Sequence, residues 1–582
     1  MLIKLCIKKI YTDTANKICL SALLVSLLAV PEQASALEEI VLKDIHGRRL
    51  NEQGLVVVDW EGQIANPAIR LFVHPPKDGT FPGNCTISST QKRLYFDLPS
   101  QVSSSGPSKI LSFSNTNPLS FYVSIFGDRD SLNENYPLTL SFTDANGSTK
   151  TQNLKVNVID QDKVQTNPFS ISVDFSKDTT GFFSTNMDHR NIFNSAAQDW
   201  AYFFDYMSLD PVSQGIEQTW IWNASGFTSG YYTANSFSYS GYLLYAYGIN
   251  VSSPPYRSGG EPSLAGGFLS SNGVSLPLKR SGGVEIEIKG NYNTLGWFLT
   301  SSDDDWWQTG NYGNEKNDLY SIAHHEIGHA LIFNPAQTRF SLYKTLGKNN
   351  DTNIISYHGT NVSIDSYDHL GGSIDRISKR GAYGNEYYGN MPARRWQITK
   401  LDLLVAQSIG YKLRDTSPFK NLQITTTGLP RGGIGGFYSQ NININGGVPS
   451  YYVFIKNGSL PQGIGLDSFS GQLSGTPKSV GDYNFTVEVR DSDEASLSVT
   501  REFNIKITST PLRIESIENN GANITVKYYT IGGYTYNVER SVDLINWTGV
   551  DLNVQGTGVL TSTVDLGRGS APKNFYRLIE IK

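Results

Sequence analysis

Three residues of one short segment, His325, Glu326 and His329, combine residue types and a spacing that could do chemistry; the segment reads His-Glu-Ile-Gly-His. On an α-helix, side chains four positions apart lie on the same face, so both imidazoles can reach one metal ion. Imidazole nitrogens are ligands that zinc prefers. Glu326 can reach a zinc-bound water, activate it as a general base and later pass the proton to a leaving amine. The segment therefore predicts a zinc-dependent hydrolase in which His325 and His329 bind the metal and Glu326 is catalytic.

The surroundings of this segment favour a metal site over a purely structural role. The chain has only eight histidines, so the pattern is improbable by chance. Two imidazoles and a carboxylate on a buried helix cost free energy unless something pairs with them. Burial of the helix is predicted by the apolar residues on both sides of the segment: Leu319, Ile322, Ala323, Ala330, Leu331 and Ile332.

The helix that carries these residues should begin near Asp318 and run to about Phe333. Asn334-Pro335 ends it, because proline disfavours helical backbone at the residue before it. A helix over residues 191–206 is predicted by an apolar stripe at offsets of four, four and three: Ile192, Ala196, Trp200 and Phe203.

A third helix should run from Lys400 to Ile409. Thr399 and Asp402 resemble a capping box at its start, and Gly410 ends it. Strands are expected among these helices, including Val284–Ile288, which we expect to be the edge strand that pairs with an extended substrate. Residues 169–415 thus form a predicted mixed α/β domain.

The five-residue motif is the zincin signature, and residues 169–415 resemble zinc metallopeptidases of the metzincin type. In metzincins the motif continues with a glycine and then a third ligand, at positions that Ile332 and Pro335 occupy here. Neither residue matches, so the third ligand must come from farther along the chain. The resemblance implies an α+β zincin domain and zinc endopeptidase activity.

His369 is the predicted third zinc ligand. It lies in the segment Tyr367-Asp368-His369-Leu370 with two glycines behind it, and secreted bacterial zincins with a late histidine ligand in a loop look similar. Asp368 is a candidate to orient a ligand ring through a hydrogen bond. Alternatives to His369 are Glu386, His358, Asp365, or water alone.

Met391 follows His369 by 22 residues and precedes the last predicted helix. Metzincin-like domains place a methionine turn beneath the zinc at a similar point, and the resemblance gives Met391 that role. An ordinary core methionine is the alternative. His324 adjoins the motif but points about 100° away from it on a helix, which predicts a packing residue or one that supports a metal ligand through a hydrogen bond.

Calcium is a further candidate cofactor. Asp303-Asp304-Asp305 and Asp491-Ser492-Asp493 offer the oxygen ligands that calcium takes, although plain polar turns would have the same composition. The thiolate of Cys85 could bind the zinc ion and hold the enzyme in a latent form; a buried free thiol is the alternative.

The rest of the chain is predicted to be all-β. Residues 37–160 contain short alternating strands and indicate an immunoglobulin-like sandwich, followed by a polar linker at 161–168. Residues 419–508 resemble bacterial immunoglobulin-like (cadherin-like) domains, on the segments Leu460–Asp467 and Gly471–Pro477. Residues 511–582 resemble a C-terminal β-sandwich of exported bacterial proteins. The predicted fold is therefore multidomain, with an α+β zincin metallopeptidase domain flanked by all-β immunoglobulin-like sandwiches.

Residues 1–36 read as a secretory signal peptide. A basic start precedes a 13-residue, mostly apolar run, and Ala34-Ser35-Ala36 supplies the small residues that signal peptidase needs. Cleavage would leave a secreted or cell-surface protein without a transmembrane anchor; retention of the segment as an anchor is the alternative. Cys85 would be the one cysteine of the mature chain, which excludes an intrachain disulfide. The net charge of −5 and the absence of a basic stripe argue against a nucleic-acid partner.

Two main hypotheses follow. In the first, the chain is a secreted zinc endopeptidase that acts on protein or peptide substrates by a Glu-activated, zinc-bound water. In the second, it is an adhesive or glycan-binding surface protein whose immunoglobulin-like domains contact cell-surface or extracellular-matrix material, with zinc structural or absent. A zinc hydrolase with a non-peptide substrate is a third hypothesis.

Overall fold

The computed structural model of the 582-residue chain describes residues 37–50, 55–60, 62, 64–96, 108–128, 131–161, 169–205, 208–225, 229–250, 258–264, 266–288, 297–299, 317–383, 396–414, 421–493, 497–509, 513–530, 535–556, 560–568 and 573–581. The predicted signal peptide, almost all of the predicted linker, Asp303–Asp305, Glu386 and Met391 lie outside these residues.

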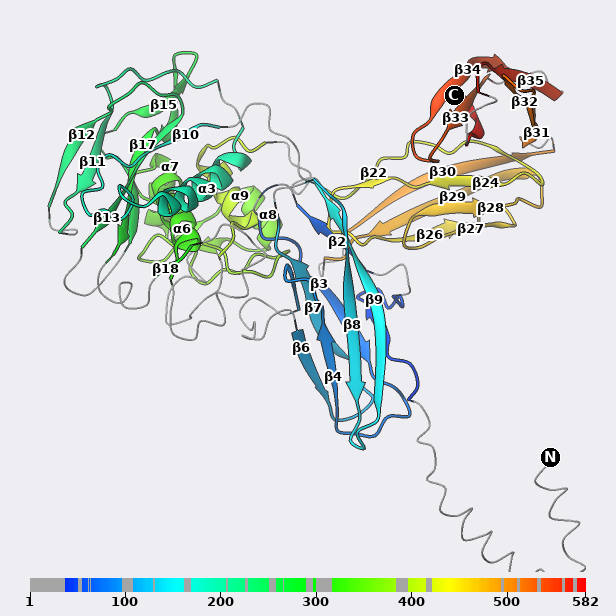
Figure 1. Ribbon diagram of the computed structural model, residues 1–582, viewed down its shortest axis with the longest axis horizontal. Coiled ribbons are helices and arrows are strands. Elements are labelled where there is room, and N and C mark those ends of the chain that lie inside the picture. The colour runs from blue at the N-terminus through cyan, green and yellow to red at the C-terminus, as the bar shows by residue number, and fades with distance from the viewer. Residues whose placement is uncertain are drawn as a thin grey trace, which may run out of the picture.

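Residues 37–161 form two facing β-sheets, which we call the N-terminal sandwich (blue to cyan in Figure 1). Strand order is β1-β3-β7-β5 in one sheet and β2-β9-β8-β4-β6 in the other. Side chains alternate between buried and exposed positions, as in β3, because successive residues of a strand point to opposite faces. The strands are β1 (Val41–Asp44), β2 (Leu55–Asp59), β3 (Ile69–His74), β4 (Gly83–Ser88), β5 (Leu94–Tyr95), β6 (Ser108–Phe113), β7 (Leu119–Ile125), β8 (Glu134–Thr143) and β9 (Thr149–Asp160).

Residues 169–414, the central unit (green in Figure 1), are built on a four-stranded sheet in the order β10-β13-β17-β14. Strands β10, β13 and β17 are parallel, and β14 is antiparallel to β17 at the edge. These strands are β10 (Ile171–Asp174), β13 (Tyr242–Ile249), β14 (Gly259–Pro262) and β17 (Ser281–Glu287).

The position of β17 corrects one prediction. The strand expected at Val284–Ile288 exists, but β17 lies between β13 and β14 and all seven of its residues are buried. It is therefore not an edge strand; β14 lies at that edge of the sheet. A fully buried strand and an edge strand can both be short and apolar, so sequence alone does not separate them.

The helices of the described residues all belong to the central unit: α3 (Met187–Phe203), α6 (Leu319–Leu331), α7 (Thr338–Leu346), α8 (Thr352–His358) and α9 (Lys400–Ile409). Short strands complete the unit: β11 (Gln218–Trp222), β12 (Gly230–Ala234), β15 (Phe268–Ser271), β16 (Val274–Lys279), β18 (Trp297–Phe298), β19 (Asn317–Asp318), β20 (Lys348–Asn349) and β21 (Val362–Ser363).

Three predicted helices are confirmed with small shifts at their ends. The capping box of α9 is present, since Thr399 Oγ1 accepts from the Asp402 amide and Asp402 accepts from the Thr399 amide. Helix α6 packs against both α3 and the β17–β14 edge of the sheet. None of the described helices has the length and apolarity that crossing a membrane requires.

Residues 421–509 form the Ig-like unit (yellow to orange in Figure 1), with sheets β23-β30-β29-β26, β24-β28-β27 and β22-β25 around their own apolar core. Its strands are β22 (Gln423–Ile424), β23 (Gly432–Gly433), β24 (Tyr438–Asn441), β25 (Ile444–Asn445), β26 (Tyr452–Gly458), β27 (Ile464–Leu466), β28 (Gln472–Gly475), β29 (Gly481–Arg490) and β30 (Ser498–Thr508).

Residues 513–581 form the C-terminal unit, with the sheets β31-β32-β35 and β34-β33-β36 and a small core of their own. The strands are β31 (Arg513–Asn519), β32 (Ile524–Tyr529), β33 (Thr535–Ser541), β34 (Thr548–Gln555), β35 (Leu560–Asp565) and β36 (Phe575–Ile581). As a whole, the described chain is mostly β and multidomain.

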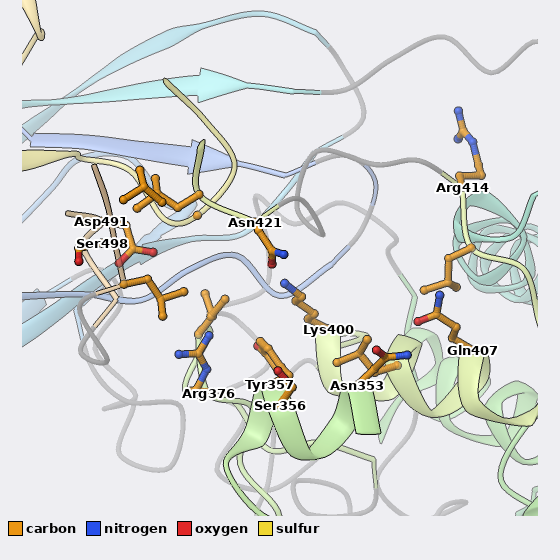
Figure 2. A pocket seen from close by; sticks show the side chains of 17 residues that line it. Asn353, Ser356, Tyr357, Arg376, Lys400, Gln407, Arg414, Asn421, Asp491 and Ser498 are labelled. Carbon is orange, nitrogen blue, oxygen red and sulfur yellow. The ribbon is translucent and has the colours of Figure 1, made fainter. Parts of the chain in front are cut away.

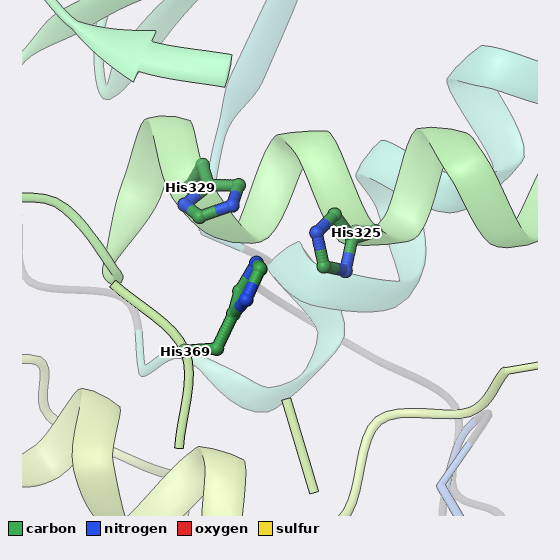
Figure 3. A group of neighbouring side chains, drawn as sticks. All are labelled: His325, His329 and His369. Atoms are coloured by element: carbon green, nitrogen blue, oxygen red, sulfur yellow. The ribbon is translucent and has the colours of Figure 1, made fainter. Parts of the chain in front are cut away.

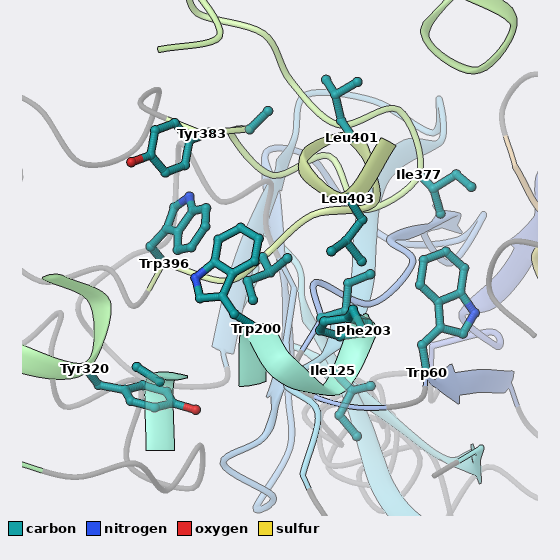
Figure 4. Close-up of a cluster of buried hydrophobic side chains, with 14 of the residues drawn as sticks. Trp60, Ile125, Trp200, Phe203, Tyr320, Ile377, Tyr383, Trp396, Leu401 and Leu403 are labelled. Atoms are coloured by element: carbon teal, nitrogen blue, oxygen red, sulfur yellow. The ribbon is translucent and has the colours of Figure 1, made fainter. Parts of the chain in front are cut away.

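One continuous apolar core joins the N-terminal sandwich to the central unit. Figure 4 shows Trp60 and Ile125 of the sandwich beside Phe203, Ile377 and Leu403 of the central unit. Backbone hydrogen bonds cross the same boundary, from the Ala65 amide to the Ile398 carbonyl (2.8 Å) and from the Ala68 amide to the Ile377 carbonyl (3.0 Å).

The Ig-like unit contacts both of its neighbours through polar groups. Arg48 of the sandwich donates to the carbonyls of Tyr451 (2.9 Å) and Ser468 (2.6 Å). Arg376 of the central unit forms an ion pair with the buried Asp493 (2.6 Å). The three units therefore pack on one another, while the C-terminal unit keeps a separate core.

Candidate metal centre

Helix α6 presents the two motif histidines from a nearly fully buried position. Asp318 precedes the helix, and its carboxylate accepts from the Ser321 hydroxyl (2.7 Å). The glycine of the motif is needed for packing, since a Cβ on Gly328 would lie 2.6 Å from a ring carbon of Tyr383. The compact Gly328 thus lets the helix approach the segment that carries Tyr383.

The structure brings His325, His329 and His369 together. Their candidate ligand atoms all lie within 4.8 Å of one another, and the ring centroids are 5.0 to 5.2 Å apart. Figure 3 shows His369 reaching from its loop toward the two rings of α6. His325 and His369 are buried and His329 is partly exposed. Three convergent imidazoles from a rigid helix and a loop are a donor set typical of catalytic zinc sites, which keep one position open.

Burial keeps the motif imidazoles neutral, the form that binds metals. Desolvation, followed by repulsion from the neighbouring imidazoles, holds the pKa of His325 well below its usual range. The pKa of His329 is lowered to about 3, mainly by desolvation and then by His369. Nδ1 of His329 lies 2.9 Å from the Phe333 carbonyl, which can only accept, so this nitrogen carries the proton and Nε2 keeps its lone pair for a metal.

Asp365, and not Asp368, lies beside the third histidine. The Asp365 carboxylate is 3.5 Å from Nδ1 of His369 and also accepts from the His369 amide (3.0 Å). Asp368 instead pairs with Lys344 (2.6 Å). Asp365, which the sequence suggested only as an alternative ligand, is thus an acidic residue that contacts His369, and the orienting role of Asp368 stays a prediction.

Glu326 is a buried carboxyl group on the same helix as the two motif histidines. Its side chain is 1% exposed, and desolvation raises its pKa to about 8. Its Oε2 atom is buried and has no hydrogen-bond partner among the residues that the structure describes. A buried carboxylate on the same helix as two neutral imidazoles fits a site that takes a divalent cation, because the cation would compensate for the lost solvation.

Tyr383 supports the site and was not singled out from the sequence. Its ring stacks on His325 (4.6 Å between centroids) and on Phe333 (3.8 Å), and its hydroxyl donates to the His325 carbonyl (2.5 Å). The Tyr383 amide donates to Asp402 (2.8 Å), the residue that caps α9. Only its position between glycines in the sequence could have hinted at a packed aromatic.

Helix α3 fixes the back of α6. The Trp200 indole donates to the His324 carbonyl (2.8 Å), and His324 Nε2 lies 2.8 Å from the Asp199 carboxylate, to which Tyr320 also bonds. His324 is therefore a buried packing residue, as predicted, with a carboxylate partner.

The remaining candidates do not join this group. His358 ends α8 and is outside the three-histidine cluster. Asp493 pairs with Arg376, and Asp491 accepts from the Val448 amide (3.2 Å). Burial raises the pKa of the Cys85 thiol to about 12, so this residue is a buried free thiol and not a ready ligand.

A second acidic group appears in the N-terminal sandwich, where carboxylate oxygens of Asp59, Asp128 and Asp160 lie within 4.8 Å of one another. Arg93 forms ion pairs with both Asp59 and Asp128. A guanidinium therefore already supplies the positive charge at this cluster.

A polar cavity of about 650 Å³ lies between α8, α9 and the Ig-like unit. Figure 2 shows Lys400, Arg376 and Tyr357 on one side and Asp491 and Ser498 on the other. Its lining includes none of the three clustered histidines.

The edge strand β14 runs directly against the motif. A Cβ on Gly260 would lie 1.7 Å from the Glu326 carbonyl oxygen, so only glycine permits this approach. Among the described residues, β14 pairs with β17 alone and is an edge strand of the sheet.

Comparison with known protein families assigns one part of the chain. Residues 421–508 match the family described as "Putative Ig domain", which confirms the predicted immunoglobulin-like character of this region. Among curated proteins, none matches the chain.

Similar solved structures include mouse cadherin-23 repeats EC22-24 (10% identity, 81% of this chain, 100% of that chain, TM-score 0.15). Protocadherin gamma B2 domains 3-6 match at 8% identity over 81% of this chain and 77% of that chain, with a TM-score of 0.14. A "putative alpha-galactosidase/melibiase" of Bacteroides fragilis matches at 22% identity over 16% of this chain, with a TM-score of 0.14; this chain spans 20% of its length.

At these TM-scores the structural likenesses carry no argument about fold or function. The family match is to an immunoglobulin-like module and not to a peptidase. The comparisons therefore support the second hypothesis, a protein that acts through Ig-like domains, better than they support the endopeptidase hypothesis.

Proposed function

We propose that the central unit is a zincin-type, zinc-dependent hydrolase, and specifically an endopeptidase. One observation carries this proposal: candidate ligand atoms of His325, His329 and His369 lie within 4.8 Å of one another, and the buried Glu326 directly follows the first of these histidines on α6. Three convergent imidazoles and one carboxylate with an unsatisfied oxygen are the parts that metal-assisted hydrolysis requires.

The residues would divide the work as follows. His325, His329 and His369 would hold zinc, which when bound supplies polarisation of the substrate carbonyl and a more acidic water. Glu326 accepts the proton of the attacking water at Oε2 and delivers it to the leaving amine nitrogen. Tyr383 keeps the His325 ring in place by stacking, and Asp365 orients His369.

Strand β14 favours a peptide substrate over a small ester or amide. An extended peptide could pair with the side of β14 that β17 leaves open, through backbone hydrogen bonds that need no particular side chain. Because Gly260 of this strand touches the Glu326 backbone, a peptide paired there would pass over the motif.

The test compares wild type with Glu326→Ala for zinc content and casein cleavage, with Glu502→Gln as a control at an exposed glutamate of β30. We expect about one zinc per chain in all three proteins, and cleavage reduced at least about 1,000-fold in Glu326→Ala alone. Wild type that binds no zinc and cuts no protein would overturn the proposal. Zinc binding with full activity in Glu326→Ala would remove the proton-transfer role.

A second candidate function is adhesion, supported by the family match over 421–508. In that case the chain would bind cell-surface or extracellular-matrix material through its Ig-like unit. Binding of labelled wild type and Glu326→Ala to matrix proteins and glycan arrays distinguishes the two: specific binding by both proteins, without cleavage by either, would favour adhesion.

A further inference from the structure

A cluster of aromatic and acidic side chains lies beside β14 on the sheet face away from α6. We define it as the Trp–Glu subsite, formed by Trp222, Tyr247, Glu261 and Glu285. The Trp222 indole donates to Glu261 Oε1 (2.8 Å), and the Trp222 amide donates to the Tyr247 hydroxyl (3.0 Å). Tyr247 in turn donates to Glu285 Oε2 (3.3 Å). The hydrogen bonds hold an indole and two carboxylates in one place.

Strand register explains why the two glutamates meet. Glu285 of β17 pairs with Gly259, and Glu261 follows two positions later on β14, so both side chains point to the same face. A Cβ on Gly259 would lie 2.7 Å from Glu285 Oε1, which means that the carboxylate fills the space left by this glycine. Glu285 is fully buried, while Glu261 is only partly buried and can be reached from outside.

Glu261 of the subsite is next in sequence to the residue of β14 that contacts the candidate catalytic helix. Gly260, which touches the Glu326 carbonyl, is the direct neighbour of Glu261. Residues of a strand are spaced about 3.4 Å apart, so a peptide paired with β14 would bring one of its side chains to Glu261 within about two positions of the bond at Glu326.

In the described part of the chain, no lysine or arginine forms an ion pair with Glu261 or Glu285. Burial raises the pKa of Glu261, and burial together with the charges of Glu261 and Glu326 raises the pKa of Glu285. A raised pKa favours the uncharged carboxyl, and a cation bound beside Glu261 would favour its ionised form. Partly exposed rings lie next to it, since Trp220 packs on Trp222 (5.5 Å) and on the half-exposed Tyr232 (5.0 Å).

We propose that the Trp–Glu subsite binds an arginine or lysine side chain of the substrate, within two residues of the scissile bond. The inference rests on the proposed endopeptidase function and names its substrate class. A guanidinium can bond to the Glu261 carboxylate while it stacks on the Trp222 or Trp220 ring, and both contacts strengthen where water is excluded.

The experiment digests a mixed peptide library with zinc-loaded wild type, Glu261→Gln and the exposed control Glu502→Gln, and maps cleavage sites by mass spectrometry. Gln keeps an acceptor for the Trp222 indole but removes the charge. We expect wild type and the control to prefer arginine or lysine over glutamine at one position near the cut by at least about tenfold in kcat/KM. Glu261→Gln should lower this ratio below about threefold while still cutting neutral peptides.

Binding without turnover separates failure of this inference from failure of the proposed function. Labelled peptides that differ only by arginine or glutamine are titrated into Glu326→Ala and into Glu326→Ala with Glu261→Gln. Cleavage with no basic preference, or with a preference that Glu261→Gln leaves unchanged, would overturn the subsite and leave the endopeptidase standing. If wild type cuts nothing, the binding titration decides. Equal binding of the two peptides to Glu326→Ala would overturn the subsite. A preference of Glu326→Ala for the arginine peptide that disappears when Glu261→Gln is added would support it.

Discussion

His369 reaches the two α6 histidines from a loop 40 residues after His329, so its contribution to metal binding can be tested by a single substitution. We expect His369→Ala to weaken zinc binding at least about 100-fold, because it removes one of three imidazole donors. His358→Ala is the matched control, since His358 was an alternative ligand and lies outside the cluster. The measurement is a competition titration against a chromophoric chelator.

The same titration can contradict the ligand assignment. Equal zinc affinities for His369→Ala and wild type would exclude His369 as a ligand. A loss of zinc affinity in His358→Ala alone would identify His358 as the third ligand. Circular dichroism of the metal-free variants checks that the fold is retained.

Asp402 gives the stability of the chain a dependence on pH. Its carboxylate is buried beneath the cap of α9, and desolvation raises its pKa to about 7, from about 4 in an unfolded chain. The folded state therefore retains a proton that the unfolded chain releases. The stability gained in this way is complete below about pH 4 and is lost as the pH rises through about 7.

We therefore expect the free energy of unfolding of wild type to fall between pH 5 and pH 8 by on the order of 2 kcal/mol more than that of Asp402→Asn, which cannot titrate. Urea unfolding with EDTA present, so that metal release does not contribute, measures the difference. Parallel pH profiles for the two proteins would show that Asp402 is ionised in the folded state.

At the scale of elements, the contact between β14 and α6 depends on a single missing side chain. Gly260→Ala would place a Cβ 1.7 Å from the Glu326 carbonyl oxygen, and a backbone atom cannot move aside as a flexible side chain can. We expect destabilisation of about 1–3 kcal/mol and a loss of peptidase activity as β14 shifts. Gly465→Ala is the control, because its nearest neighbour would be 4.0 Å away. Thermal unfolding without such a difference would refute the contact.

Local signals were the ones that the sequence could reveal. The spacing of His325 and His329, and the pairing of Thr399 with Asp402 at the start of α9, depend on neighbours within one or two helical turns. Those features appear in the structure as expected.

Non-local features were missed or misplaced for a physical reason. The strand containing Val284 was found, but its place inside the sheet depends on which strand pairs beside it, and β14 is a glycine-rich segment with almost no apolar pattern. Tyr383 and Asp365 act through contacts that the folded loops create, so no periodicity marks them. His369 could be proposed because its segment, with two glycines behind it, resembles the loop of secreted bacterial zincins that carries a late histidine ligand.

At the scale of the whole molecule, the N-terminal sandwich and the candidate metal centre share one apolar core, whereas the C-terminal unit has its own. Trp60 of the sandwich is almost fully buried in the shared core, near Phe203 and Leu403 of the central unit (Figure 4). Removing a buried aromatic ring of this kind costs about 3–5 kcal/mol. Because the core is continuous, we expect loss of the Trp60 ring to destabilise α6, although Trp60 belongs to another unit.

We therefore expect Trp60→Ala to increase hydrogen exchange in peptides of α6 and to lower zinc occupancy, while Tyr528→Ala, a buried aromatic of the C-terminal core, leaves α6 unchanged. Exchange mass spectrometry on the full chain measures both variants side by side. If Trp60→Ala loosened only the sandwich strands, the two units would fold independently. The sandwich would then be a separable accessory domain and no part of the scaffold that positions the three histidines.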